Sequence, residues 1–171
     1  MFTRHLARAA AVLALVALGG TAPTSGRFGP AWISIEYPAN PYDRDTREAY
    51  LVVHAFHHQV ATGLPVEGRA EGLVSGARKT IPLTFRPTSR TGAFALDQQW
   101  PKDGNWILVI TAKQGEHGGA TALVEIGRDG RVSSVRVPTR RMPDNGYVIP
   151  ADVTAADVDA ALARVSRSGV N

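Results

Sequence analysis

Apolar and polar side chains alternate with a period of two along most of the chain between residues 31 and 137. This pattern is typical of half-buried β-strands, because successive side chains of a strand point to opposite faces of a sheet. Glycine, proline, asparagine and aspartate separate the alternating segments and indicate tight turns. The predicted strands are residues 31–37, 49–56, 66–74, 80–86, 93–99, 105–112, 121–126 and 131–137.

The segment from Asn105 to Ala112 has the clearest strand pattern. Trp106, Leu108 and Ile110 would share one face of this strand, while its other face also carries branched aliphatic side chains. We expect Trp106 to be the central aromatic residue of the core. Loss of such a side chain typically costs about 3 to 5 kcal/mol of stability.

The segment 66–74 has a different composition on its two faces. Small residues, among them Gly68 and Gly72, occupy the face predicted to point inward, which leaves room for large side chains opposite. Glu67, Arg69 and Glu71 occupy the face predicted to point to water. The next segment, 80–86, contains Pro82 and is therefore expected at the edge of a sheet, because proline donates no ladder hydrogen bond.

Seven or eight short strands joined by turns, with no helix between them, predict an all-β fold. We expect residues 27–137 to form an immunoglobulin-like antiparallel β-sandwich. A barrel is the alternative, but the strands differ in length and Pro82 indicates an open edge.

Residues 138–171 are predicted to form an irregular connector followed by a short amphipathic helix. Thr154 and Asp157 have the spacing of a capping box, and Val153 and Val158 that of a hydrophobic staple. The helix would carry one apolar stripe, made by Val158, Ala161, Leu162 and Val165. This stripe is expected to dock onto the sandwich; the alternative is a tail that binds a partner.

Residues 1–26 have the layout of a signal peptide and a short spacer. Arg4 and Arg8 precede an apolar run over residues 9–18, which is half the length of about 20 residues that a membrane-spanning helix needs. We expect cleavage of this leader and export to the periplasm or the extracellular space. Contact with the membrane would then require an uncleaved leader, since the chain has no cysteine to carry a lipid.

The composition excludes several classes of function. The chain has no cysteine, which excludes thiol catalysis, zinc–thiolate sites and iron–sulfur clusters. Removing Arg4 and Arg8 from the 19 basic side chains leaves 17 against 15 acidic ones, an ordinary balance. The basic residues are interleaved with strand-forming residues and not clustered with aromatic ones, so we expect no nucleic-acid partner.

Four histidines are the candidate metal ligands. His54, His57 and His58 lie within five positions, and His117 follows in a glycine-rich turn. Imidazole is the commonest metal ligand in proteins, and copper or zinc would be the metal. In an extended strand, however, His54 and His58 would share a face about 13 Å apart, so they converge only if the chain bends near Phe56. The alternative is a set of polar surface residues, with no cofactor.

The sequence offers no catalytic signature. No serine lies in a Gly-x-Ser-x-Gly elbow. Glu67 and Glu71 would lie about 13 Å apart on one strand face, farther than the carboxylate pairs of glycosidases. No helix follows the glycine-rich turns, so they are not phosphate-binding loops. We therefore expect a protein that is not an enzyme.

Two motifs resemble those of known exported domains. The run Gly63-Leu64-Pro65-Val66-Glu67-Gly68 is similar to a turn of carboxypeptidase-regulatory-like and YtkA-like domains, and the run from Gly104 to Ile110 resembles a strand of the YtkA-like and FixH-like group. The resemblance implies a bacterial exported or membrane-associated β-sandwich, which in some members is associated with metal handling or the assembly of respiratory complexes. This chain lacks the methionine-rich segments of the copper-handling members.

Two functional hypotheses follow. The first is an exported, non-enzymatic module that binds a protein or a cell-envelope component through its loops or through the edge strand around Pro82. The second is a periplasmic accessory protein that binds copper or zinc through His54, His57, His58 and His117.

Overall fold

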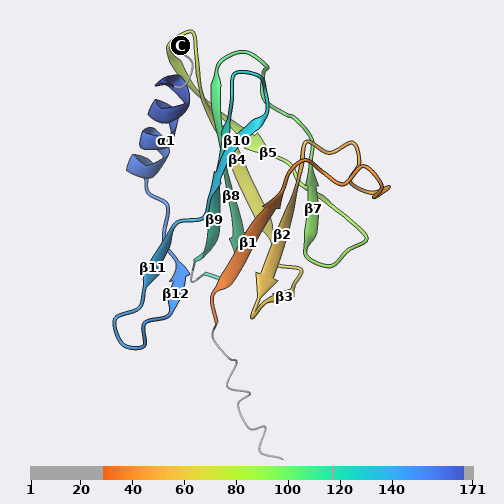
Figure 1. Ribbon diagram of the computed structural model, residues 1–171, viewed down its shortest axis with the longest axis vertical. Helices are drawn as coiled ribbons and strands as arrows, with labels where there is room; N and C mark the ends of the chain where they lie inside the picture. Colours follow the sequence, from red (N-terminus) through yellow and green to blue (C-terminus); the bar gives the residue numbers. More distant parts are fainter. Residues whose placement is uncertain (1–28, 117, 168–171) are drawn as a thin grey trace, which may run out of the picture.

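The computed structural model describes residues 29–116 and 118–167, so the predicted leader and His117 lie outside the described part. Within that part the chain forms twelve strands and one helix, shown in Figure 1. The strands are β1 (Ala31–Glu36), β2 (Leu51–His57), β3 (Val60–Ala61), β4 (Val66–Val74), β5 (Ala77–Leu83), β6 (Arg86–Pro87), β7 (Ala93–Leu96), β8 (Asn105–Lys113), β9 (Gly119–Ile126), β10 (Val132–Arg136), β11 (Thr139–Arg141) and β12 (Val148–Pro150). The helix is α1 (Ala155–Arg167).

Two sheets stack to form the sandwich. The first sheet has the order β1-β2-β7-β6, with β3 paired to β2, and the second has the order β10-β9-β8-β4-β5. All pairings in the described residues are antiparallel. The first order corresponds to strands A-B-E-D of an immunoglobulin domain. The second corresponds to strands G-F-C-C′, with β10 added next to strand G. The prediction of an all-β, immunoglobulin-like sandwich with a C-terminal helix is confirmed.

The core between the sheets is organised around Trp106, as predicted. Trp106 is buried and lies directly opposite Gly72 of the neighbouring strand β4. A Cβ atom at position 72 would overlap the indole ring, so this position must be glycine for the ring to pack there. The Trp106 indole Nε1–H donates to the carbonyl oxygen of Asp103 at 2.7 Å, which satisfies its polar atom.

Helix α1 forms a third layer on the outer face of the second sheet (Figure 1). Its apolar stripe packs on Ile107 and Val109 of β8. The predicted capping box is present, because Thr154 N–H donates to Asp157 Oδ2 at 2.8 Å and Asp157 N–H donates to Thr154 Oγ1 at 3.2 Å. The packing of the apolar stripe on β8 confirms the predicted docking. Among the described residues, no helix has the length and apolar character needed to cross a membrane.

The predicted exposure of Glu71 is wrong. Glu71 is only 5% exposed, because it lies on the face of the second sheet that α1 covers. Its carboxylate accepts hydrogen bonds from Arg69 Nε at 2.7 Å, from Thr80 Oγ1 at 3.0 Å and from Arg78 Nε at 3.2 Å. Burial acts to raise the pKa of Glu71, but these hydrogen bonds and the charge of Arg78 outweigh it and hold the pKa below its usual value.

Ion pairs join α1 to the sheet on both sides of its apolar stripe. Arg78, which binds Glu71, also pairs with Asp159 of the helix. Glu125 of β9 is buried and accepts from Arg164 Nη2 at 2.8 Å and Arg164 Nε at 3.0 Å. The helix thus covers both apolar and charged side chains that a bare sheet would expose to water.

Two local predictions need correction. The edge strand β5 begins at Ala77 rather than Thr80, although Pro82 does lie in an edge strand as predicted. The predicted irregular connector contains the hairpin β11–β12, paired from Thr139↔Pro150 to Arg141↔Val148. This hairpin forms one wall of the candidate site.

Candidate functional site

A large hollow lies at the end of the sandwich where β1 begins. Its volume is about 910 Å³, and the start of β1, the β2–β3 turn, the β8–β9 turn and the β11–β12 hairpin surround it. These elements meet at the lower end of the molecule in Figure 1. We call this hollow the groove; its lining is Gly29, Pro30, Trp32, His58, Gln59, Gln114, Gly115, Met142, Asn145, Tyr147, Val148 and Ile149.

A tight turn brings the predicted ligand His58 to the groove and places His57 beside it. Because His57 pairs with Val60, only His58 and Gln59 remain as the turn between β2 and β3. Their φ angles are +52° and +65°, as a two-residue hairpin turn requires. The rings of His57 and His58 lie side by side, with 4.2 Å between their centroids.

Both rings bind the backbone of Gly29. His57 Nε2 is 2.9 Å from the Gly29 carbonyl oxygen, and Gly29 N–H donates to His58 Nε2 at 3.3 Å. A Cβ atom at position 29 would overlap the His58 imidazole, so this contact requires glycine. The two histidines therefore hold the chain where it enters β1.

Gln114 completes this contact from the second sheet. Its Oε1 accepts a hydrogen bond from Ala31 N–H at 2.6 Å, and its Nε2 donates to the Gly29 carbonyl oxygen at 3.0 Å. We call the set of His57, His58 and Gln114 around Gly29 the clamp. The clamp fixes one side of the groove by joining the start of β1 to the turns that follow β2 and β8.

The β11–β12 hairpin supplies the apolar wall. Its loop is closed by a hydrogen bond from Met142 N–H to the Tyr147 carbonyl oxygen at 2.7 Å and by one from Arg141 Nη1 to the Gly146 carbonyl oxygen at 2.7 Å. Tyr147 is nevertheless 69% exposed, and Val148 beside it is 45% exposed. A well-bonded loop therefore presents large apolar side chains to the solvent.

Of the four predicted metal ligands, the structure describes His54, His57 and His58. His54 lies on β2 and its Nε2 is 2.8 Å from Glu36 Oε2, apart from the clamp. His57 and His58 are adjacent, and His117 lies outside the described residues. In residues 29–116 and 118–167, no three histidine or acidic side chains are grouped closely enough to hold a metal ion. The metal site stays a prediction.

The sequence did not reveal the groove itself. Trp32 lies in the predicted strand 31–37, and Tyr147 lies in the segment predicted as an irregular connector. The lining comes from four segments that are far apart in the sequence, and local patterns do not report such a meeting. The available signal was the concentration of apolar residues, Tyr147 to Ile149, directly after an Asn-Gly turn.

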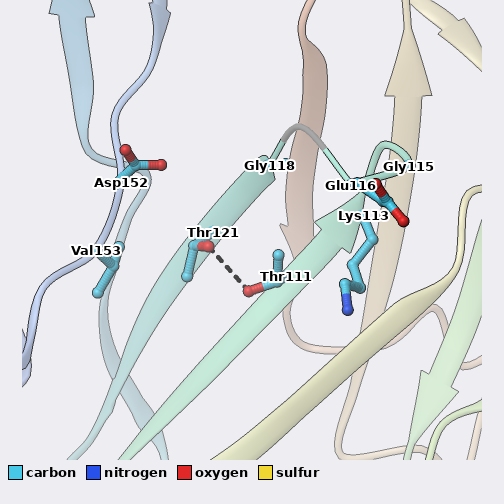
Figure 2. Close-up of a pocket in the computed structure, with 9 residues that line it drawn as sticks. Thr111, Lys113, Gly115, Glu116, Gly118, Thr121, Asp152 and Val153 are labelled. Atoms are coloured by element: carbon cyan, nitrogen blue, oxygen red, sulfur yellow. Dashed lines mark hydrogen bonds between the residues drawn. The ribbon is translucent and has the colours of Figure 1, made fainter.

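A second, smaller hollow of about 390 Å³ lies between the end of β8, the start of β9 and the connector before α1. Figure 2 shows Thr111 and Thr121 facing each other across the two strands, with their hydroxyl oxygens 2.9 Å apart, and Asp152 and Val153 on the connector. Lys113 pairs with Glu67 at 3.1 Å. Thr111 and Thr121 thus pair within this hollow, while Lys113 pairs with a carboxylate outside its lining.

The fold and the groove define an immunoglobulin-like sandwich with an open end. Comparison with protein-family models, with curated proteins and with solved structures finds no match to the chain. The motif that begins at Gly63 lies in the loop that leads into β4, and the motif that begins at Gly104 leads into β8. The resemblance to YtkA-like and FixH-like domains stays a prediction that depends on these motifs.

Proposed function

We propose that this protein is an exported, non-enzymatic β-sandwich module that binds a component of the cell envelope, and that the groove is its binding surface. The observation that carries the proposal is the open groove at one end of a closed sandwich. Two aromatic residues line it: Tyr147, which is largely exposed, and Trp32, which is half-buried. Concave sites with an apolar lining and a few fixed polar groups are typical of ligand binding.

The polar part of the groove supports binding rather than catalysis. Within the described residues, its lining contains no carboxylate, lysine or arginine side chain. His57 and Gln114 already bond to the backbone of Gly29. General acid–base chemistry needs ionisable groups within hydrogen-bond reach of a substrate. The ionisable side chains of this lining are His58 and Tyr147, and His58 Nε2 already accepts a hydrogen bond from Gly29 N–H.

The test is a capture experiment with the exported protein immobilised and incubated with envelope extract. A Tyr147→Ala variant removes the most exposed ring of the groove, and Tyr42→Ala is the matched control because Tyr42 is 92% exposed and does not line the groove. We expect the wild type and Tyr42→Ala to retain the same component and Tyr147→Ala to lose it. Equal retention by both variants would remove the groove from the proposal.

A second proposed function is the binding of copper or zinc at the β2–β3 turn. The adjacent rings of His57 and His58 favour it. A metal at Nε2 of either ring would replace a hydrogen bond to Gly29, so binding would open the clamp. Calorimetric titration with copper(II) and zinc(II) tests this proposal, and the absence of heat at micromolar metal would end it. His58→Asn serves as the comparison variant, because it removes one of the two imidazole rings and keeps a residue tolerant of positive φ.

A further inference from the structure

We infer that the groove takes a neutral oligosaccharide. This inference rests on the proposed function, because it names the class of envelope component that the groove would bind. Three properties of the described lining support it: the lack of charged side chains, the presence of both aromatic rings and uncharged polar groups, and the size of the hollow.

The charge of the lining selects a neutral ligand. Phosphates and nucleotides are bound by arginine or lysine side chains or by helix N-termini, and the described lining contains neither. Arg140 and Arg141 lie on β11 outside the lining, where Arg140 donates to the Met142 sulfur at 3.3 Å and Arg141 donates to the Gly146 carbonyl oxygen. A ligand with a fixed charge would therefore lose its hydration without gaining a partner.

The aromatic rings provide flat apolar surfaces. Trp32 is on β1 and Tyr147 precedes β12, so the two rings come from different elements around the hollow. The faces of aromatic rings carry partial negative charge. A sugar ring presents C–H groups on its own faces, and these groups can stack on such a surface.

The remaining lining provides hydrogen bonds of the kind that hydroxyl groups need. Gln59 and Asn145 carry amides, which both donate and accept. Asn145 Oδ1 accepts a hydrogen bond from Tyr147 N–H at 3.0 Å. This bond fixes the orientation of the Asn145 side chain and therefore of its NH₂ group. Sugar hydroxyls also donate and accept, so they match this set better than the side chains of an apolar peptide do.

The size of the groove favours an oligomer over a single sugar. Small-molecule sites in proteins typically measure about 300 to 1,000 Å³, and the groove, at about 910 Å³, is near the upper limit. It is also bounded by separate loops rather than enclosed by one. A short chain of sugar rings would thus fill it, with its ends continuing into solvent.

The experiment uses tryptophan fluorescence of the exported protein. The chain has three tryptophans, of which Trp100 and Trp106 are 5% and 2% exposed, so a ligand in the groove reports through Trp32. The probes are cellotetraose, chitotetraose and maltotetraose, with tetragalacturonate as the anionic comparison. We expect a saturable change with at least one neutral tetramer and none with the anionic one, and loss of the change in Trp32→Phe.

Calorimetry on variants gives the second readout. Tyr147→Ala should weaken binding by about tenfold, the effect of losing one ring contact of about 1.4 kcal/mol. Tyr42→Ala should bind as the wild type does. Because both tyrosines are largely exposed, thermal melting should show both variants folded.

The outcomes separate this inference from the proposed function. If no neutral tetramer binds at millimolar concentration while the capture of an envelope component still depends on Tyr147, the oligosaccharide is wrong and the binding groove stands. Binding of tetragalacturonate alone, or of an apolar peptide in place of the sugars, also overturns the inference. If neither sugars nor envelope components depend on Tyr147, the proposed function fails as well.

Discussion

The two ends of the β1–β2 pair carry similar residues but differ in packing. At one end, which we call the closed end, Tyr37, Tyr50 and Trp100 pack on one another, with ring centroids 5.6 Å apart for the tyrosines and 4.9 Å apart for Tyr50 and Trp100. At the other end, Trp32 and Tyr147 line the groove. Aromatic content alone therefore does not decide whether an end of the sandwich closes.

The difference lies in what the polar atoms contact. At the closed end the Tyr50 hydroxyl donates to the Gly130 carbonyl oxygen at 2.8 Å, which joins the first sheet to the β9–β10 turn. Burial raises the pKa of the Tyr50 phenol well above its ordinary value. At the groove, the side chains of the clamp form hydrogen bonds with the backbone of Gly29 and Ala31. These bonds join the two sheets there, so the aromatic rings are not needed for that purpose.

The largest expected effect is at the closed end. Trp100→Ala removes a buried ring in contact with Tyr50 and should lower the free energy of unfolding by about 3 to 5 kcal/mol. Urea denaturation measures this loss, with Tyr42→Ala as the control for removal of an exposed aromatic ring. A loss below about 1 kcal/mol would mean that this end is packed as loosely as the groove.

The sheet face beneath α1 can be compared with both ends of the β1–β2 pair, because charged groups rather than aromatic rings stabilise it. Glu71→Gln leaves Arg69 and Arg78 without their carboxylate and should cost about 1 to 3 kcal/mol at neutral pH. The pKa of Glu71 is lowered by folding, so its contribution is present above the unfolded pKa of about 4.3 and is lost as the pH falls through the folded value.

The pH dependence distinguishes this face from the ends. The stability difference between the wild type and Glu71→Gln should be constant near neutral pH and should narrow below about pH 4. Thermal melting over this range measures it, with Trp100→Ala as the variant whose deficit should not follow the titration of Glu71. A difference that widens in acid would contradict the assignment of Glu71 as a stabilising carboxylate.

A smaller effect is expected at the clamp. Gln114→Ala removes hydrogen bonds to Ala31 and Gly29 and should cost about 1 to 2 kcal/mol. The same variant should increase amide hydrogen exchange at the start of β1 without affecting the closed end. Uniform changes at both ends would show that the clamp is part of one cooperative core and has no local role.

The smallest effect is expected in the wall of the groove. Tyr147→Ala should change the stability by no more than about 0.5 kcal/mol, because the ring is largely exposed. Chemical denaturation beside Tyr42→Ala tests this. A large loss at Tyr147 alone would mean that the groove is a packed surface, and the contrast between the two ends would disappear.

Local patterns in the sequence predicted the strands and the helix well. The bounds of β4 are those predicted, and β8 extends the predicted segment by one residue, to Lys113. Alternation is a property of neighbouring residues, and so is the capping box of Thr154 and Asp157. Trp106 could be placed in the core because its strand is apolar, whereas its pairing with Gly72 appears only in the structure.

Long-range arrangements could not be predicted in this way. Glu71 follows the pattern of an exposed residue, and only the docking of α1, more than 80 positions later, buries it. Arg140 and Arg141 gave β11 no apolar face to recognise. Among the predicted ligands, His54, His57 and His58 are close in sequence and His117 lies in a separate turn. The hairpin turn sends His57 and His58 to Gly29, while His54 pairs with Glu36.

Strand β8 is enclosed on both sides, by the first sheet and by α1. Its amides should therefore exchange with solvent only when the whole domain unfolds. The strand leads directly into Gln114 and Gly115 at the groove. A ligand there would meet a base that is already ordered, so little conformational entropy would be lost on binding.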